Sequence, residues 1–180
     1  MYIKNCRLKH LRRLDEDTIS YYVQALSFVK PIQTKRNIRN MTLGDVDFIK
    51  SKINSKEDID LIKIVALCQG VSARKILNMR IIMFFRLIAS VRSQIKKIVL
   101  AEENLSPNHV NVKWEMVKGQ ERMSKFGIYN ILENLSNGDP LKYKSIMKME
   151  YSEVFTILLM KKTNKDLQYE MSKIKIKTEE

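Results

Sequence analysis

The side chains best suited to nucleophilic or metal chemistry are few in this sequence. It contains two cysteines, Cys6 and Cys68, and two histidines, His10 and His109. A zinc site takes several such ligands at close spacing, and only Cys6 and His10 stand near one another in the chain. Neither histidine lies beside a serine or cysteine in a recognisable motif. We therefore expect no metal site and no catalytic residue.

Phosphate-binding loops and magnesium sites also lack sequence support. The 5 glycines are too widely spaced for a G-x-x-x-x-G-K-[ST] or a G-x-G-x-x-G motif. The Asp-x-Asp pairs at 45–47 and 58–60 carry oxygen ligands, but each stands where a helix is expected to begin. Carboxylates at that place stabilise the helix N-terminus without any metal. The sequence thus predicts no cofactor and a protein that is not an enzyme.

Lysine and arginine are the residues whose number and grouping indicate a partner. The net charge is +13, from 33 basic and 20 acidic residues. Such a surplus attracts nucleic acid, acidic protein surfaces or anionic membranes, although a lysine-rich surface also keeps a protein soluble. Basic clusters occur within 7–13, 30–39 and 86–97. The candidate contacts to an anion or nucleic acid are Arg7, Lys9, Arg12, Arg13, Arg36, Arg39, Arg86 and Lys97.

The elements that must position these residues are mostly helices. Only 5 glycines and 3 prolines interrupt the chain, which favours helix. Apolar spacing and capping residues predict helices over 19–29, 44–53, 59–69, 73–100 with a kink near Asn78, 126–136, from 139 and from 152. The alternation of Val110, Val112, Trp114 and Met116 with polar residues predicts a strand with one buried face. The expected fold is mainly α, an α-dominant α+β fold with one or two short strands.

Composition along the chain predicts one central domain with two charged ends. Residues 1–14 are expected to form a basic arm or edge strand, 15–162 a single helical domain, and 163–180 a charged helix end or tail. The apolar run IIMFFRLIASV is broken by Arg86 and is too short to span a bilayer, so we expect no membrane partner. Cys68 lies in the apolar run IVALC and is expected to be a reduced core residue, which indicates synthesis in the cytoplasm.

The long predicted helix carries more apolar surface than one core-facing stripe requires. The core is expected to centre on Phe84, Leu87, Ile88, Val91, Trp114, Phe155 and Leu158. Ile81, Ile82 and Phe85 lie off the stripe on this helix. Two interpretations remain open for these three residues. Either the start of the helix is buried on every side, or they form an interface between subunits, for which they are the candidates.

Four segments resemble small virion-morphogenesis proteins of tailed bacteriophages that infect gut bacteria. They are MTLGDVDFIKSKI at 41–53, DLIKIVALCQGVS at 60–72, ILNMRIIMFFRLIASV at 76–91 and SKFGIYNILENLSNGDPLKYKSIMKMEYSEVFTILLM at 124–160. Neck-ring and tail-assembly chaperone-like proteins look similar, with a GD-type turn, a small helix and then a bulky apolar helix. The resemblance implies a non-enzymatic structural or assembly role.

The expected function is that of a virion structural or assembly protein of the neck, connector or tail region. It would act through protein–protein contacts in a multi-copy assembly, with other virion proteins and copies of itself as partners. It would be located in the virion after synthesis in the host cytoplasm. The alternative is a basic nucleic-acid-binding protein that uses its lysine and arginine clusters on DNA.

Overall fold

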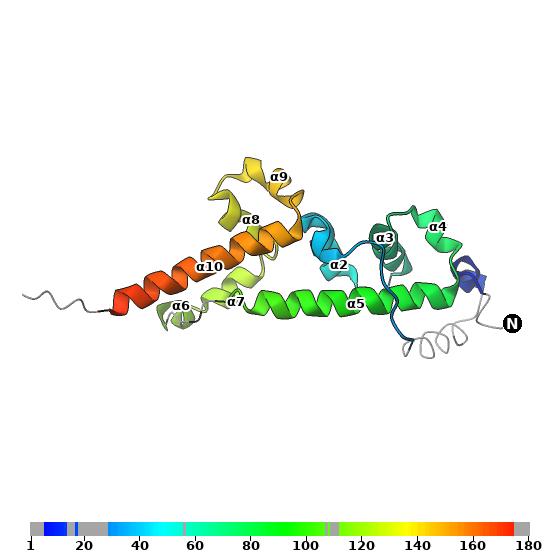
Figure 1. Ribbon diagram of the computed structural model, residues 1–180, viewed down its shortest axis with the longest axis horizontal. Coiled ribbons are helices and arrows are strands. Elements are labelled where there is room, and N and C mark those ends of the chain that lie inside the picture. Colours follow the sequence, from blue (N-terminus) through cyan, green and yellow to red (C-terminus); the bar gives the residue numbers. More distant parts are fainter. Residues whose placement is uncertain are drawn as a thin grey trace, which may run out of the picture. The chain divides into compact units, whose positions relative to one another are not determined.

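The computed structural model describes residues 6–13, 17, 29–55, 57–106, 108 and 112–174. Helices make up 73% of the structure, which confirms the mainly α fold class (Figure 1). Within the described ranges, the α-helices are α2 (Leu43–Lys52), α3 (Asp58–Gln69), α4 (Ala73–Leu77), α5 (Ile81–Glu103), α6 (Val112–Met116), α7 (Gly119–Ser124), α8 (Tyr129–Ser136), α9 (Tyr143–Met147) and α10 (Tyr151–Lys173). Short 3-10 helices lie at η2 (Leu8–Arg13), η3 (Ile38–Asn40) and η4 (Pro140–Lys142).

The chain packs into two compact units. The first contains Met1–Met41 and Asp45–Ile98, and the second contains Thr42–Gly44 and Val99–Glu180. A compact unit need not fold separately, so this division does not decide the number of domains. The single helical domain expected over 15–162 stays a prediction.

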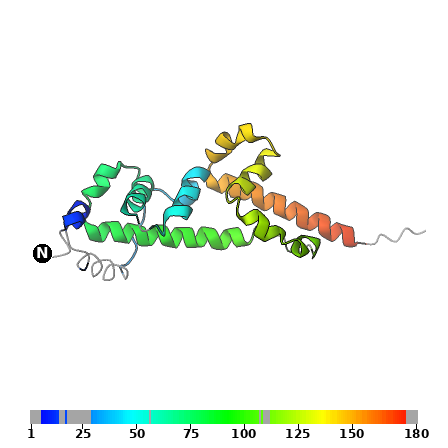
Figure 2. The same ribbon diagram turned by 180° about the vertical axis from the view of Figure 1, so that it is seen from behind.

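The core of the first unit lies between α3, α4 and the N-terminal part of α5, which Figures 1 and 2 show beside one another. Apolar residues of α3 and α4, with Leu8 of η2, pack against Phe84, Leu87 and Ile88. These three residues and Val91 are buried, as their helical spacing predicts. Burying a side chain of this size stabilises the fold by about 1.5–3 kcal/mol. The stripe on α5 therefore accounts for much of the stability of this unit.

Two helices of the first unit end at residues that favour a helix end. Gly70 ends α3 with a left-handed backbone, φ 62°, a conformation that glycine adopts without strain. A Cβ atom on Gly70 would also lie only 3.2 Å from Nε of Arg36. Asn78 caps α4 and separates it from α5. The single kinked helix predicted over 73–100 is therefore two helices, and the kink expected near Asn78 is a complete break.

The second unit is built around the first half of α10. Tyr151 and Val154 are buried, and Phe155 and Leu158 are half-buried. Asp139 caps η4 by accepting a hydrogen bond from the Leu141 N–H at 3.0 Å, with Pro140 in the first turn. The predicted start at Asp139 is therefore confirmed.

The strand predicted around Trp114 is wrong. Val112–Met116 is a short α-helix, and Trp114 is 46% exposed rather than part of the core. A Cβ atom at Gly119 would lie 2.2 Å from the indole ring, so Trp114 covers the bare backbone of that glycine. Five alternating residues do not hold a strand without a neighbour to pair with. The described residues contain only isolated bridges, Arg7 with Arg80 and Thr42 with Glu150.

The basic arm or edge strand expected over 1–14 stays a prediction. Residues 8–13 form a 3-10 helix, and the bridge at Arg7 joins this segment to the residue before α5. Outside the described residues lie 19–28 of the helix predicted over 19–29, Val110 of the predicted strand, and the last residues of the tail, 175–180.

Candidate functional site

The candidate interface residues Ile81, Ile82 and Phe85 contribute to a core. Ile81 is fully buried and packs on Cys6, while Ile82 and Phe85 are half-buried against this pair. The rings of Phe84 and Phe85 meet edge to face, with centroids 5.7 Å apart. Ile81 therefore offers no surface to a second subunit, which corrects its place among the candidates. An interface role for Ile82 and Phe85 stays a prediction.

Two of the candidate basic residues are engaged within the first unit. The Arg86 Nε–H donates to the backbone oxygen of Lys30 at 3.0 Å, which attaches the segment before η3 to α5. The guanidinium of Arg36 lies over Gly70. These contacts give Arg36 and Arg86 a structural role in addition to any ligand contact.

The other basic candidates lie at the surface. Arg7, Lys9, Arg39 and Lys97 are exposed, and the side chains of Arg12 and Arg13 lie outside the described residues. Arg39 and Lys97, which are far apart in the sequence, line one pocket together with Lys35. The structure thus brings members of two predicted basic clusters together.

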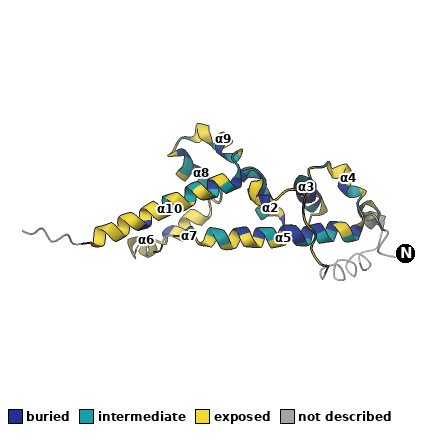
Figure 3. Ribbon diagram, in the orientation of Figure 1, coloured by how far each residue is buried: buried dark blue, intermediate teal, exposed yellow. Residues whose placement is uncertain are grey.

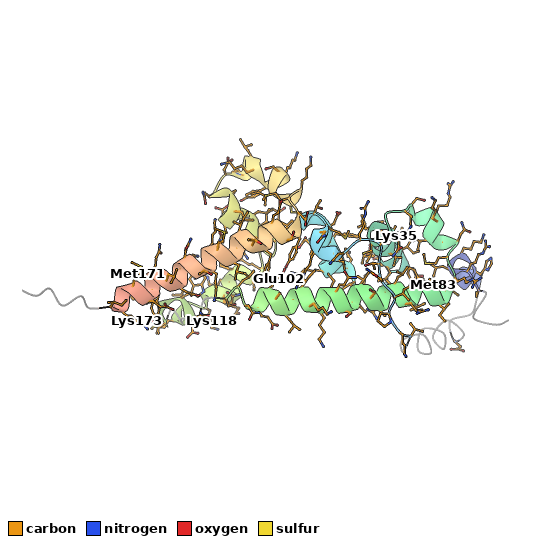
Figure 4. The ribbon with its side chains drawn as sticks, viewed as in Figure 1. Lys35, Met83, Glu102, Lys118, Met171 and Lys173 are labelled. Atoms are coloured by element: carbon orange, nitrogen blue, oxygen red, sulfur yellow. The ribbon has the colours of Figure 1, made fainter. Side chains whose placement is uncertain are left out.

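A surface that the sequence analysis did not anticipate lies on the second half of α10. Apolar side chains are exposed there, while the start of the same helix is buried (Figure 3). The exposed fractions are 62% for Met160, 50% for Leu167, 68% for Met171 and 68% for Ile174. Figure 4 marks Met171 near the end of this helix. We call Met160, Asn164, Leu167 and Met171 on α10, together with Ile174, the extended residue that caps its C-terminal end, the α10 seam.

The spacing of the α10 seam is that of a coiled coil. Successive members are separated by four, three, four and three residues, which is the alternation of heptad positions d and a. Half-buried Ile157 occupies the preceding a position. At about 3.6 residues per turn, the seam falls opposite the face formed by Val154, Leu158 and Asp166, which packs within the second unit.

Polar contacts hold that inner face in place. Asp166 is buried and pairs with Lys162 at 2.9 Å, and it also accepts a hydrogen bond from the Asn108 N–H at 3.2 Å. Because α10 is attached to its unit along this inner face, its opposite face is fixed toward the outside. Met160 and Asn164 are therefore presented away from the unit, while Leu167 and Met171 lie on the part of α10 beyond Asp166, where every residue is exposed.

The described residues offer little reactive chemistry. Burial raises the pKa of the Cys68 thiol to about 12; the negative charge of Asp45 adds to this and the positive charge of Arg36 opposes it. A thiol with so high a pKa is a poor nucleophile at neutral pH. No group of three or more His, Cys, Asp or Glu in the described part of the chain is placed to hold a metal ion. In the same part, no helix has the length and apolar character needed to cross a bilayer.

No family model matches the chain, and no curated protein or solved structure is significantly similar to it. The functional argument therefore starts from the two surfaces that its own residues form, the α10 seam and the basic pocket.

Proposed function

We propose that this chain is a non-enzymatic assembly protein that acts through protein–protein contacts in a multi-copy assembly, in which copies join through the α10 seam. The observation that carries this proposal is the heptad-spaced row of exposed apolar side chains on α10. Exposing apolar side chains to water is unfavourable, and this cost is removed when the side chains are buried between two paired helices.

A second copy of the chain is the partner that best fits the α10 seam. Asn164 occupies an a position in the middle of the apolar row. Against an apolar neighbour its amide would lose its hydrogen bonds to water without replacement. In a parallel pair of identical helices, each Asn164 faces the other and the two amides bond to one another. Asn164 thus favours a parallel pair in register.

The flanking side chains are compatible with this pairing. Exposed Gln168 occupies an e position, and exposed Thr163 and Glu170 occupy g positions. In a parallel pair, a g position faces the e position of the next heptad on the partner. Thr163 then faces Gln168 of the other copy, with no repulsion between like charges.

The free energy available from the α10 seam predicts a weak contact. Burying a whole side chain of this kind is worth about 1.5–3 kcal/mol, so burying the exposed parts of four on each copy is worth roughly 10 kcal/mol. Association itself costs about 4–15 kcal/mol. Isolated copies should therefore pair reversibly, and copies held together by a larger assembly should pair more completely.

The resemblance to phage morphogenesis proteins supports placing this assembly in a virion, in the neck, connector or tail region. The partners would then be other virion proteins together with further copies of the chain, and synthesis would precede assembly in the host cytoplasm. This part of the proposal rests on the four resembling segments of the sequence.

The proposal is tested by placing charge on the α10 seam. In Leu167→Glu/Met171→Glu, two carboxylates stand on each helix where the copies would meet, and like charges across that contact should prevent pairing. We expect the wild-type chain to show a mass that rises with concentration in sedimentation equilibrium. The double variant should remain monomeric over the same range, with about a tenfold or greater rise in the dissociation constant.

A matched control changes the same residue types elsewhere. Leu141 is 90% exposed and Met116 is 79% exposed, and neither lies on α10. The control Leu141→Glu/Met116→Glu should associate as the wild type does, and circular dichroism should show equal helicity for all three proteins. Equal association of the seam variant and the control would refute pairing through α10.

A further inference from the structure

A second surface, in the first unit, does not depend on the α10 seam. It is a pocket of about 520 Å³ between the segment around η3 and α5. Every residue that lines it has a polar side chain, and three of these side chains are cationic. The residues that concern the argument are Lys35, Asn37, Arg39 and Asn40 on the segment, and Gln94 and Lys97 on α5. Lys35 is marked in Figure 4.

The floor of this pocket is fixed by hydrogen bonds between the two elements. Gln94 donates through Nε2 to the hydroxyl of buried Thr34 at 2.9 Å, and its Oε1 accepts from the Ile38 N–H at 3.1 Å. The Thr34 hydroxyl in turn donates to the backbone oxygen of Arg36 at 2.7 Å. Gln94 therefore helps to hold the segment on α5, together with the bond from Arg86 to Lys30 and the backbone bond from the Arg36 N–H to the Cys68 oxygen at 3.0 Å. These contacts position the backbone of Lys35 and Arg39.

The three cations of the pocket face no opposing charge within it. No carboxylate is among the residues that line it, and within the described ranges no ion pair to Lys35, Arg39 or Lys97 occurs. Three positive charges gathered without acidic partners repel one another. An anion that binds between them relieves this repulsion and forms charge-assisted hydrogen bonds.

The amides around these cations add neutral donors. Asn37 uses its Oδ1 to cap η3, accepting from the Arg39 N–H at 3.1 Å. With its oxygen engaged by the backbone, the Asn37 amide nitrogen is left to donate to a ligand. Lysine, arginine and amide donors together are the set that proteins use to hold phosphate oxygens.

We propose that this pocket binds phosphate groups of a nucleic-acid backbone. A pocket of this volume is larger than one phosphate ion, so it has room for an adjoining sugar. No aromatic ring lines it, so no base can stack there. The ligand is recognised through its phosphates, and binding is independent of base sequence. The net charge of +13 steers the polyanion toward the molecule.

The test compares the full-length wild type with Lys35→Gln/Arg39→Gln/Lys97→Gln. Fluorescence anisotropy measures binding to two labelled 20-base-pair DNA duplexes of unrelated sequence, over a series of salt concentrations. Because all three side chains are exposed, the variant should fold normally. We expect its affinity to fall about tenfold or more near 100 mM salt, and the slope of log K against log salt to shrink by about three.

A matched control removes the same charge elsewhere. Arg122, Lys144 and Lys148 are exposed and lie in the second unit. The control Arg122→Gln/Lys144→Gln/Lys148→Gln also loses one arginine and two lysines. The proposal requires the pocket variant to lose clearly more affinity than this control, and to lose it equally for both duplexes. Equal losses in the two variants would overturn the proposal, since only the total charge would then matter.

A competition experiment distinguishes a polymer site from a site for small phosphates. Inorganic phosphate at matched ionic strength should displace DNA only at millimolar concentration. Displacement at micromolar concentration, lost in the pocket variant, would identify a free phosphate compound as the ligand and overturn the assignment to nucleic acid. If the pocket does not bind DNA, the proposed association through the α10 seam is not affected. The two proposals are tested on different residues and by different measurements.

Discussion

At the scale of single residues, Cys68 shows how burial decides chemistry. The sequence predicts a core cysteine from its place in an apolar run, and the side chain is fully buried. Its pKa follows from that burial and from the nearby charges of Asp45 and Arg36. Only the first of these influences is visible in the sequence, because neither charged residue is adjacent to Cys68 in the chain.

The expected outcome is a thiol that resists alkylation. Raising the pKa from 9.0 to about 12 lowers the thiolate fraction at pH 8 by about a thousandfold. Because the folded state holds the proton more tightly than the unfolded chain, this group favours folding below pH 9 and that contribution is lost as the pH rises toward 12. Iodoacetamide labelling, with peptide mass spectrometry to separate Cys68 from Cys6, measures the rate. Labelling of Cys68 in native protein as fast as in denatured protein would contradict the burial argument.

The position of Trp114 could not be predicted from the sequence pattern. A large apolar side chain in an alternating pattern favours a buried strand, yet this one covers the backbone of Gly119 at the surface. The contact joins residues five apart across the turn between α6 and α7, and no periodicity encodes it. Ile81 is the opposite case. It lies off the apolar stripe of α5, but Cys6 of the N-terminal segment covers it.

At the scale of elements, local signals predicted boundaries where one residue determines the backbone. Gly70 ends a helix and Asp139 begins one as expected, while the kink expected near Asn78 is a complete break between α4 and α5. For the second half of α10 the sequence predicts only a charged helix end or tail over 163–180. The helix continues to Lys173. Lysines between the seam positions concealed the heptad spacing, and the hydrogen bond from the Asn108 N–H to Asp166, which attaches the inner face to its unit, joins residues far apart in the sequence.

Gln94 forms two of the hydrogen bonds that hold the segment around η3 on α5. Gln94→Ala removes the hydrogen bonds to Thr34 and Ile38 and leaves both buried groups without that partner. We expect a loss of about 1–3 kcal/mol in the free energy of unfolding, measured by urea denaturation, together with weaker DNA binding because Lys35 and Arg39 are no longer fixed. Gln120 is exposed, so Gln120→Ala should change stability by less than about 0.5 kcal/mol. Equal stability of the two variants would show that the segment is held by other contacts.

At the scale of the whole molecule, the net charge opposes binding at one proposed surface and favours it at the other. The net charge of +13 repels a second copy of the chain and attracts a polyanion. Composition alone predicts this balance, but it does not locate either surface. The α10 seam and the basic pocket lie in different units, so substitutions can alter one and leave the other intact.

Added salt should therefore strengthen self-association through the α10 seam and weaken DNA binding at the basic pocket. Added salt shortens the screening length from about 10 Å at 0.1 M to about 3 Å at 1 M. Repulsion between copies then weakens and the dissociation constant of self-association should fall several-fold, while DNA affinity should drop by orders of magnitude. Sedimentation equilibrium and anisotropy on the same preparation, in 0.1 M and 0.5 M NaCl, measure both. The triple pocket variant carries three fewer charges, so its self-association should depend less on salt than that of the wild type. Self-association that weakens with salt would mean that ionic contacts, rather than the apolar seam, hold the copies together.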